Sequence, residues 1–323
     1  MSRIIGLDMA KADLEAAFVQ QQAVLERASF PNTDPGHRAL HQRLLPGDVV
    51  VMEATGPYHL ALALFLQERG VAVCVVNPLS VKRFAQMRLC RAKTDRKDAE
   101  LIAAYAHSRN PPRWQPEPAY AAQIKQLQAL AGQLDKQRTA LVNQRQAFAL
   151  PPQANQLALE LLDRLIGGLG QELGALERAQ LELVGQHCPD TYRALLTVPG
   201  IGPKTALLLI ALTANFTRFA RAKQLVSYVG LSPSVRQSGT SVRGRGRICK
   251  MGMARIRKLL YMCSWSAWRY NPFCKELHRR LAAKGKPERL IKIAVANKLL
   301  RQAFAVGTNC VKFSKNYPLT LAS

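Results

Sequence analysis

Four acidic residues in the first hundred positions have the types and surroundings expected of a metal site. Asp8 lies inside the apolar run IIGLDM, and Glu53 ends the apolar run VVVME. Asp95 and Asp98 are three residues apart at the start of a helical pattern, so their side chains share one helix face. Mg²⁺ prefers carboxylate oxygens, and a pair of such ions can activate a nucleophile at a phosphodiester. The four residues therefore predict a catalytic magnesium site.

A simpler interpretation exists for two of these four residues. Asp95 suits the first turn of a helix, where the helix dipole favours a negative charge, and Asp98 then only faces solvent. Asp8 and Glu53 are harder to explain in this way. Each adjoins apolar strand residues, where a charge without a partner is costly.

A second candidate for chemistry is the Gly- and Arg-rich segment QSGTSVRGRGRICKMG, residues 237–252. Its glycines let the backbone approach a ligand closely, and the forked guanidinium groups of Arg243, Arg245 and Arg247 match phosphate oxygens. Ser238 and Ser241 are candidate nucleophiles, but a serine hydroxyl needs a base, a metal or positive charge to activate it. The alternative is a basic loop that grips a nucleic-acid backbone without chemistry.

The segment VPGIGPKTA, residues 198–206, joins two apolar helical patterns and resembles a helix-hairpin-helix. Such a turn presents backbone N–H groups to a phosphate, which makes Gly200, Gly202 and Lys204 candidate DNA-binding residues. An ordinary turn between packed helices is the alternative. Five aromatic residues farther along alternate with basic ones; some can stack on bases, although helical spacing favours packing for most of Tyr228, Tyr261, Trp265, Trp268 and Tyr270.

The net charge of +25 is concentrated at one end of the chain. Residues 1–190 contain 21 Lys and Arg against 19 Asp and Glu, whereas residues 191–323 contain 25 against only Glu276 and Glu288. A segment this basic repels itself unless a polyanion neutralises it, and nucleic acid is the usual partner. A merely solvated basic surface is the alternative. We expect no contact with a membrane, because no basic amphipathic segment flanks either terminus and no long apolar run occurs.

The elements that must position these residues fall into three predicted domains. Residues 1–113 show the order βββ-α-β-α-β-α, which predicts an α/β domain with a mixed sheet. Residues 114–190 hold two long helical patterns, 119–148 and 156–186, that fold back on each other or pair with another chain. Residues 191–323 form a basic, mostly α-helical domain. Glycines at 167, 168 and 170 weaken the second long helical pattern.

Several blocks of the sequence carry a family resemblance. IGLDMAK, VVMEATGPYH and KTDRKDAELIA resemble the Asp-Glu-Asp-Asp core of bacterial insertion-sequence transposases related to the Piv DNA invertase. The resemblance continues in the same order through LTVPGIGPKTALLLIA, FARAKQLVSYVGLSP and QSGTSVRGRGRICKMGMARIRKLLY, so it covers most of residues 3–310.

This resemblance implies a RuvC-like, RNase H fold at the amino terminus, with Mg²⁺ held by Asp8, Glu53, Asp95 and Asp98. It also implies that a serine of the carboxy-terminal domain attacks DNA covalently. That role falls on Ser238, with Ser241 as the alternative. A structured guide RNA, called a bridge RNA, is a further implication, and its backbone could lie along residues 82–113, which hold nine Lys and Arg.

Together these features predict a DNA recombinase of a mobile element that joins strands through a phosphoserine intermediate. Donor and target DNA are the expected substrates, and bringing them together predicts a homo-oligomer, a dimer or tetramer, with residues 119–186 as the contact. We expect a cytoplasmic protein associated with the bacterial nucleoid. Two alternatives stay open: a metal-only endonuclease that resolves Holliday junctions, and a non-catalytic nucleic-acid-binding protein.

Overall fold

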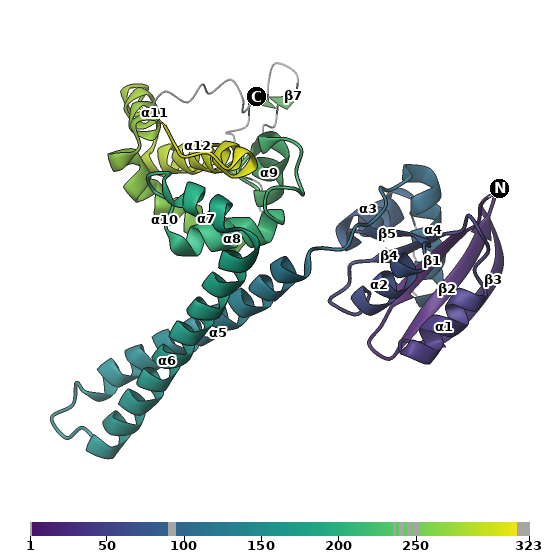
Figure 1. Ribbon diagram of the computed structural model, residues 1–323, viewed down its shortest axis with the longest axis horizontal. Coiled ribbons are helices and arrows are strands. Elements are labelled where there is room, and N and C mark those ends of the chain that lie inside the picture. Colours follow the sequence, from purple (N-terminus) through teal and green to yellow (C-terminus); the bar gives the residue numbers. More distant parts are fainter. Residues whose placement is uncertain are drawn as a thin grey trace. The chain divides into compact units, whose positions relative to one another are not determined.

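A computed structural model of the chain describes residues 2–89, 95–234, 237–238, 242–243, 247–248 and 252–314, with only the backbone at 95, 96, 234, 237, 238, 242, 243 and 247. The chain divides into two compact units, Met1–Pro116 and Glu117–Ser323. Figure 1 shows that the first unit, in purple and blue, contains a sheet, whereas the second is built mainly of helices.

The first unit is a five-stranded sheet in the order β3-β2-β1-β4-β5. Its strands are β1 (Ile4–Met9), β2 (Asp13–Gln20), β3 (Ala23–Pro31), β4 (Val49–Glu53) and β5 (Ala72–Val76). β2 runs antiparallel to β1 and β3, whereas β4 is parallel to both β1 and β5. An antiparallel meander followed by parallel strands with intervening helices is the arrangement of the RNase H fold. The predicted RuvC-like fold class is therefore confirmed.

Helices cover both faces of this sheet: α1 (Asp34–Gln42), α2 (Leu60–Glu68), α3 (Pro78–Met87) and α4 (Asp95–Arg109). Ile5, Leu7 and Met9 of β1 share a core with residues of α1 and α2. Residues on the opposite face of the sheet, such as Val51 and Ala17, pack instead on α4. Successive residues of a strand point to opposite faces, so the side of Ile4, Gly6 and Asp8 is the α4 side.

Gly6 permits a very close approach between a helix and a strand of this unit. A Cβ atom at this position would lie 2.1 Å from the carbonyl oxygen of Ala99 and 2.7 Å from the backbone nitrogen of Ala103. Only glycine lets α4 lie this close to β1. The contact fixes α4, and with it the first turns of that helix, directly over the central strand.

α3 is the one helix of this unit that the helical periodicity does not predict. It begins at Pro78, and the side chain of Asn77 accepts a hydrogen bond from the backbone nitrogen of Leu79 at 2.8 Å. Asparagine before the first turn followed by proline at its first position is a common helix start. The dipeptide Asn77-Pro78 was therefore the sequence feature from which the start of α3 could have been predicted.

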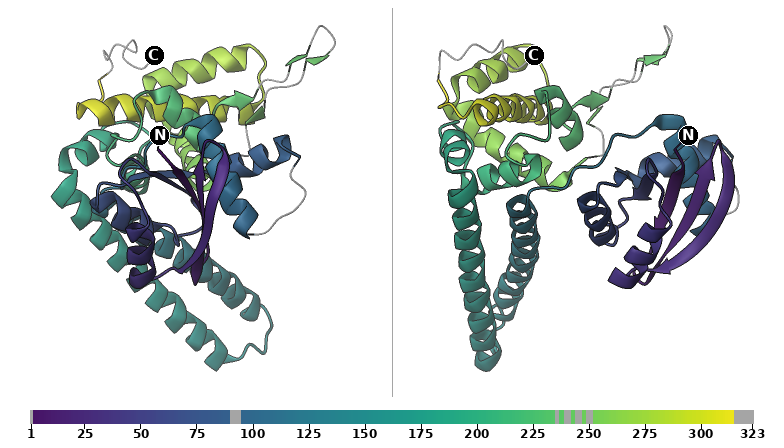
Figure 2. Two further views of the ribbon diagram at one scale, coloured as in Figure 1. Left: turned by 90° about the vertical axis from the view of Figure 1, so that its right-hand side faces the viewer. Right: turned by 45° about the vertical axis from the view of Figure 1, so that its right-hand side comes forward.

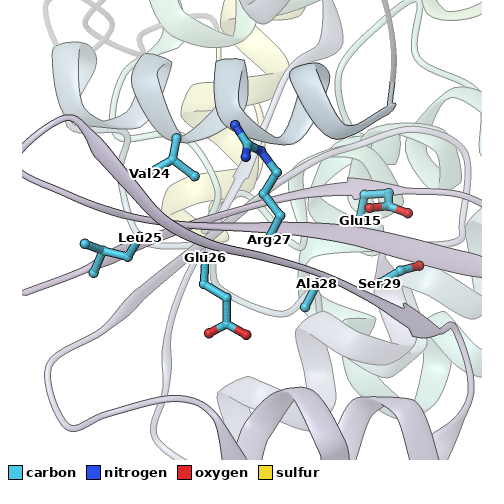
Figure 3. A pocket seen from close by; sticks show the side chains of 7 residues that line it. All are labelled: Glu15, Val24, Leu25, Glu26, Arg27, Ala28 and Ser29. Carbon is cyan, nitrogen blue, oxygen red and sulfur yellow. The ribbon is translucent and has the colours of Figure 1, made fainter.

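β3 is an edge strand with a shallow hollow of about 460 Å³ along it, shown in Figure 3 and lined by Glu15, Val24, Leu25, Glu26, Arg27, Ala28 and Ser29. Arg27 extends from β3 toward the crossing helix, and its Nε donates to Oε1 of Glu100 in α4 at 2.5 Å. Charged side chains on an exposed edge oppose pairing with another strand. This ion pair also ties the edge of the sheet to α4.

The second unit begins with two long helices, α5 (Ala119–Phe148) and α6 (Gln156–His187). They pack against each other along their length and form a projecting arm (Figures 1 and 2). Near the tip, Nη2 of Arg145 donates to Oδ2 of Asp163 at 2.9 Å across the two helices. The two predicted helices thus fold back on each other. α6 is continuous through its glycines at 167, 168 and 170.

The remainder of this unit contains α7 (Pro189–Leu196), α8 (Pro203–Thr213), α9 (Ala222–Val229), α10 (Ala254–Tyr270), α11 (Pro272–Ala283) and α12 (Glu288–Asn309). Nine consecutive residues of α8, from Thr205 to Thr213, are buried, so this helix is enclosed on all sides. The expected mostly α-helical carboxy-terminal region is confirmed. None of the helices in the described ranges is both long and apolar enough to cross a membrane.

The contact at Gly6 predicts the effect of one substitution. Gly6→Ala forces α4 away from β1 and lowers the stability of the amino-terminal unit by about 3 kcal/mol. Calorimetry of the whole protein should show the transition of this unit at lower temperature. The control is Gly168→Ala in α6, where no atom lies within 4 Å of an added Cβ, and it stabilises by about 1 kcal/mol. An unchanged transition in Gly6→Ala would contradict the close packing.

Candidate active site and nucleic-acid interface

Asp8 and Glu53 occupy neighbouring positions at the carboxyl ends of two parallel strands. The paired registers of β1 and β4 end with Leu7 opposite Met52, and Asp8 and Glu53 are the next residues of the two strands. Both acidic residues are half-buried. Both belong to the α4 side of the sheet, since Leu7 and Met52 face α1 and α2. The structure thus brings two of the four predicted carboxylates to adjoining sites.

α4 carries the other two predicted carboxylates toward the same strand. Asp98 is half-buried and directly precedes Ala99, whose carbonyl oxygen lies against Gly6. Gly6 is two residues before Asp8 on the same face of β1. Asp95 is the first residue of α4, but its side chain lies outside the described part of the structure.

Glu15 is a carboxylate that the sequence patterns did not single out. It pairs with Asp8 across β1 and β2, and Ser29 of β3 pairs with Glu15 in turn. Glu15, Asp8 and Glu53 therefore occupy one row across three adjacent strands, on the α4 side. Like charges opposite each other in a sheet destabilise it unless a cation or donor lies between them. Only the register reveals this row, because Glu15 belongs to an ordinary alternating strand pattern.

The described side chains do not by themselves complete a metal site. Among them, no group of three or more His, Cys, Asp or Glu residues is close enough together to hold an ion. Thr55 donates from Oγ1 to Oε2 of Glu53 at 3.4 Å. The donor chemistry nonetheless suits Mg²⁺, because every candidate ligand in this row is a carboxylate.

His59 is a second residue near this edge that the sequence analysis did not single out. It lies six residues after Glu53, at the start of α2, and only 7% of its surface is exposed. Burial lowers the pKa of His59, which favours its neutral imidazole. A lone histidine in the run GPYHL has no spacing signal that would have marked it.

Four short strands in and beside the Gly- and Arg-rich segment form two antiparallel pairs. β6 (Pro233–Ser234) pairs with β9 (Arg247–Ile248), and farther out β7 (Gln237–Ser238) pairs with β8 (Val242–Arg243). Ser238 lies opposite Val242 in the outer pair. In both views of Figure 2, the two outer strands stand clear of the helices of their own unit. Ser238 is thus carried on a projection.

Gly252 and Arg257, which follow β9 in the chain, both lie against the end of α9. Gly252 has φ = +107°, and an added Cβ would lie 2.7 Å from the carbonyl oxygen of Val229, at the end of α9. Nη1 of Arg257 donates to that same carbonyl at 3.1 Å. Side chains of Ser238, Arg243 and Arg247 lie outside the described part of the structure, and so do Ser241 and Arg245 entirely.

The two glycines of the predicted phosphate-binding turn between α7 and α8 lie in different surroundings. Gly200 has φ = +104°, and an added Cβ would lie 2.7 Å from Cβ of Ala267 in α10. This glycine is thus explained by packing. Gly202 precedes α8 with an ordinary extended conformation and no atom near an added Cβ, and Lys204 is exposed. Gly202 and Lys204 are therefore the accessible part of the turn.

The sequence is similar to transposases and to pilin gene-inverting proteins. Residues 5–150 match a family model described as "Transposase", of the DEDD type, and residues 192–279 match one described as "Transposase IS116/IS110/IS902 family". The pilin gene-inverting protein of Moraxella lacunata is 32% identical over 94% of this chain and 94% of its own length. The transposase for insertion sequence element IS1111A of Coxiella burnetii is 26% identical, over 80% of this chain and 76% of its own length.

A solved structure of T. thermophilus RuvC in complex with Holliday junction substrate aligns over 35% of this chain and 100% of that chain, with a TM-score of 0.28 and 14% identity. The chain belongs to the family of IS110-type transposases and pilin gene-inverting proteins, with a RuvC-like amino-terminal unit.

The turn between α7 and α8 supplies a matched pair of variants. Gly200→Ala strains the backbone and displaces α10, so we expect a loss of about 2–4 kcal/mol in the stability of the helical unit, seen as a lower thermal midpoint. Gly202→Ala should leave that midpoint unchanged. If α8 approaches a phosphate, Gly202→Ala weakens DNA binding in a titration while the fold is retained. Equal midpoints for the two variants would contradict the packing role of Gly200.

Proposed function

We propose that this protein is an insertion-sequence recombinase that breaks and rejoins DNA strands with the help of Mg²⁺. The observation that carries the proposal is the register of β1 and β4, which makes Asp8 and Glu53 neighbours at one edge of an RNase H-type sheet. Membership of a transposase family supports DNA as the substrate. The helical unit from residue 117 onward adds 31 Lys and Arg against 10 Asp and Glu, a balance that suits phosphate backbones.

Asp8, Glu53, Asp95 and Asp98 would hold the metal, with Glu15 next to Asp8 in the same row. Bound Mg²⁺ supplies charge stabilisation at the attacking and leaving oxygens of a phosphodiester. The row of carboxylates provides the negative field that attracts the cation, and α4 holds Asp98 over the strand. This role explains why charged residues occupy the ends of buried strands.

Ser238 is the proposed nucleophile. Its Oγ bonds to the phosphorus of the scissile phosphate, the bridging sugar oxygen leaves with a proton, and a phosphoserine link results. Attack by another strand's hydroxyl on that phosphorus restores the serine and joins the strands. The run 237–252 contains no histidine, so a base elsewhere, a metal or the surrounding positive charge would have to activate the serine hydroxyl. Ser241 is the alternative nucleophile, and Arg243, Arg245 and Arg247 would bind phosphate oxygens.

A guide RNA is a second part of the proposal, which rests on the family resemblance and on the charge of this chain. Nine Lys and Arg between residues 82 and 113 would bind its backbone. The donor and target DNA would then be selected by pairing with this bridge RNA. Copurification of one discrete RNA with the expressed protein is the expected observation.

The chemistry is tested by comparing serine and carboxylate variants in a strand-exchange assay with magnesium. Ser238→Ala abolishes both the covalent protein–DNA adduct and strand exchange, while Ser241→Ala, three residues away, retains both. Asp8→Asn lowers strand exchange by about a thousandfold or more without changing DNA affinity. Chelation of Mg²⁺ has the same effect as Asp8→Asn.

Other outcomes identify the competing functions. If Ser238→Ala still cleaves DNA whereas Asp8→Asn does not, the protein is a metal-only endonuclease of the junction-resolving type. If the wild type and both variants bind DNA alike but none of them cleaves or exchanges strands, the protein acts only by binding nucleic acid. Loss of strand exchange in Ser241→Ala alone would move the nucleophile to that residue.

Synapsis of two DNA molecules requires more than one subunit, and the arm is the proposed contact. Leu157, Leu161 and Leu165 of α6 follow one another at helical spacing and are 62%, 44% and 55% exposed. The segment 119–187 has six basic and six acidic residues, so it lacks the excess charge of the rest of its unit. A neutral, apolar helix face suits a second copy of the arm better than nucleic acid.

We expect Leu161→Glu to shift the protein from a dimer or tetramer toward monomer, because it places a charge in the centre of this face. Sedimentation analysis measures the change. Gln171→Glu, which adds the same charge at an exposed position of α6, serves as the control and leaves the assembly intact. An unchanged oligomer in Leu161→Glu would exclude this face of the arm.

A further inference from the structure

α10 exposes a stripe that mixes basic and apolar side chains. Lys258, Met262, Trp265 and Arg269 follow at intervals of four, three and four residues, so they lie along one side of the helix, and all four are exposed. Met262 is 58% exposed and Trp265 is 44% exposed. The opposite side of α10 is buried in the core of the unit, through Ile256, Leu260, Ser264 and Ala267. Packing therefore does not account for Trp265.

A buried lysine holds the indole of Trp265 in place. Nζ of Lys292, in α12, lies 3.0 Å from the centroid of the Trp265 ring. Only 6% of the Lys292 side chain is exposed, and Nζ also lies 3.4 Å from Oε1 of Glu288. An ammonium over an aromatic face is attractive, more so where water is excluded. One side of the indole is thus covered by Lys292 while a large part of the ring still faces solvent.

Side-chain contacts next to Trp265 connect the three helices α10, α11 and α12, which Figure 1 shows. Trp268 of α10 stacks on His278 of α11, with ring centroids 4.7 Å apart and planes 20° apart. Nε2 of His278 lies 3.3 Å from Oε1 of Glu288, the same oxygen that pairs with Lys292. The hydrogen bond from His278, assisted by Lys292, lowers the pKa of Glu288. Contacts among α10, α11 and α12 therefore surround the position of Trp265.

The charge around this stripe selects its partner. Residues 191–323 contain only two acidic residues, Glu276 and Glu288, and Glu288 is already paired with His278 and Lys292. Lys258 and Arg269 stand about 17 Å apart along α10, with Met262 and Trp265 between them. Basic residues on either side of exposed apolar ones suit a polyanion that also has flat apolar surface. Unpaired nucleotides have both, whereas a closed duplex hides its base faces.

We propose that Lys258, Met262, Trp265 and Arg269, the Trp265 surface, bind a single-stranded segment of nucleic acid. One unpaired base stacks on the exposed part of the indole, and Lys258 and Arg269 contact phosphates on either side of it. The proposal rests on nucleic acid being the substrate of this protein. It does not depend on the serine chemistry or on the metal.

The contact is tested by fluorescence, because the chain has only three tryptophans, Trp114, Trp265 and Trp268. In the full-length double variant Trp114→Phe, Trp268→Phe, all indole emission comes from Trp265. We expect a single-stranded oligothymidylate or oligouridylate to quench this emission. A duplex at the same phosphate concentration should quench much less. Equal quenching by duplex, or none by either single strand, would overturn the proposal.

Affinity measurements separate stacking from charge. Trp265→Leu weakens single-strand binding about tenfold, whereas Trp265→Phe retains a ring and most of the affinity. Neither change alters the salt dependence. Lys258→Gln lowers the slope of log affinity against log salt by about one instead. Thermal midpoints equal to that of the wild type show that the variants fold. Wild-type affinity in Trp265→Leu would contradict the stacking role.

The same oligonucleotides show whether the bound strand is RNA or DNA. They also separate a failure of this inference from a failure of the proposed function. Tighter binding of oligouridylate than of oligothymidylate would identify RNA as the occupant, and the reverse would identify DNA. Ser238→Ala should quench like the wild type, because the Trp265 surface does not include the serine. If quenching is absent while strand exchange persists, this inference fails and the proposed function survives.

Discussion

The close contact between α4 and β1 at Gly6 is the constraint on which the amino-terminal unit depends. Any side chain at this position would collide with the backbone of Ala99, so the helix and the strand could not share the space. Because the contact is backbone to backbone, it sets the height of α4 above the sheet almost without freedom. Asp95 and Asp98 belong to α4, and Asp8 follows Gly6 by two residues in β1. A change in this contact therefore moves Asp95 and Asp98 relative to Asp8.

The second unit also contains glycines that allow close contacts between its elements. Arg257 donates to the carbonyl of Val229, and an added Cβ at Gly252 would collide with the same carbonyl, so the backbone at Gly252 lies close to the end of α9. The outer pair of strands, β7 and β8, stands clear of the helices of its own unit (Figure 2). Gly200 plays a similar part against Ala267. The sequence motif predicted that Gly200 and Gly202 both bind phosphate. In the structure Gly200 is required for packing, and only Gly202 offers accessible backbone.

The sequence predicted most of the sheet, since alternating strands and buried runs have strong periodic signals. It also predicted both long helices and the ordered blocks by which the family is recognised. α3 was missed because its apolar residues have no clear helical period, and its start depends on a two-residue cap. Glu15 was missed because a glutamate in an amphipathic strand is unremarkable until its partner across the sheet is known. The sequence did not show which of the five aromatic residues pack and which are exposed, because spacing alone cannot show which side of a helix is covered.

By itself, the sequence determined the residue types: carboxylates at strand and helix ends, a serine among glycines and arginines, and a basic carboxy-terminal half. These depend on local pattern and composition, which the chain carries wherever it folds. Only the tertiary structure decided which carboxylates are neighbours, which glycines are needed for packing, and that Trp265 faces solvent above Lys292. Those facts depend on strand register and helix packing, which bring together residues far apart in the chain, and no local pattern encodes the distance between them.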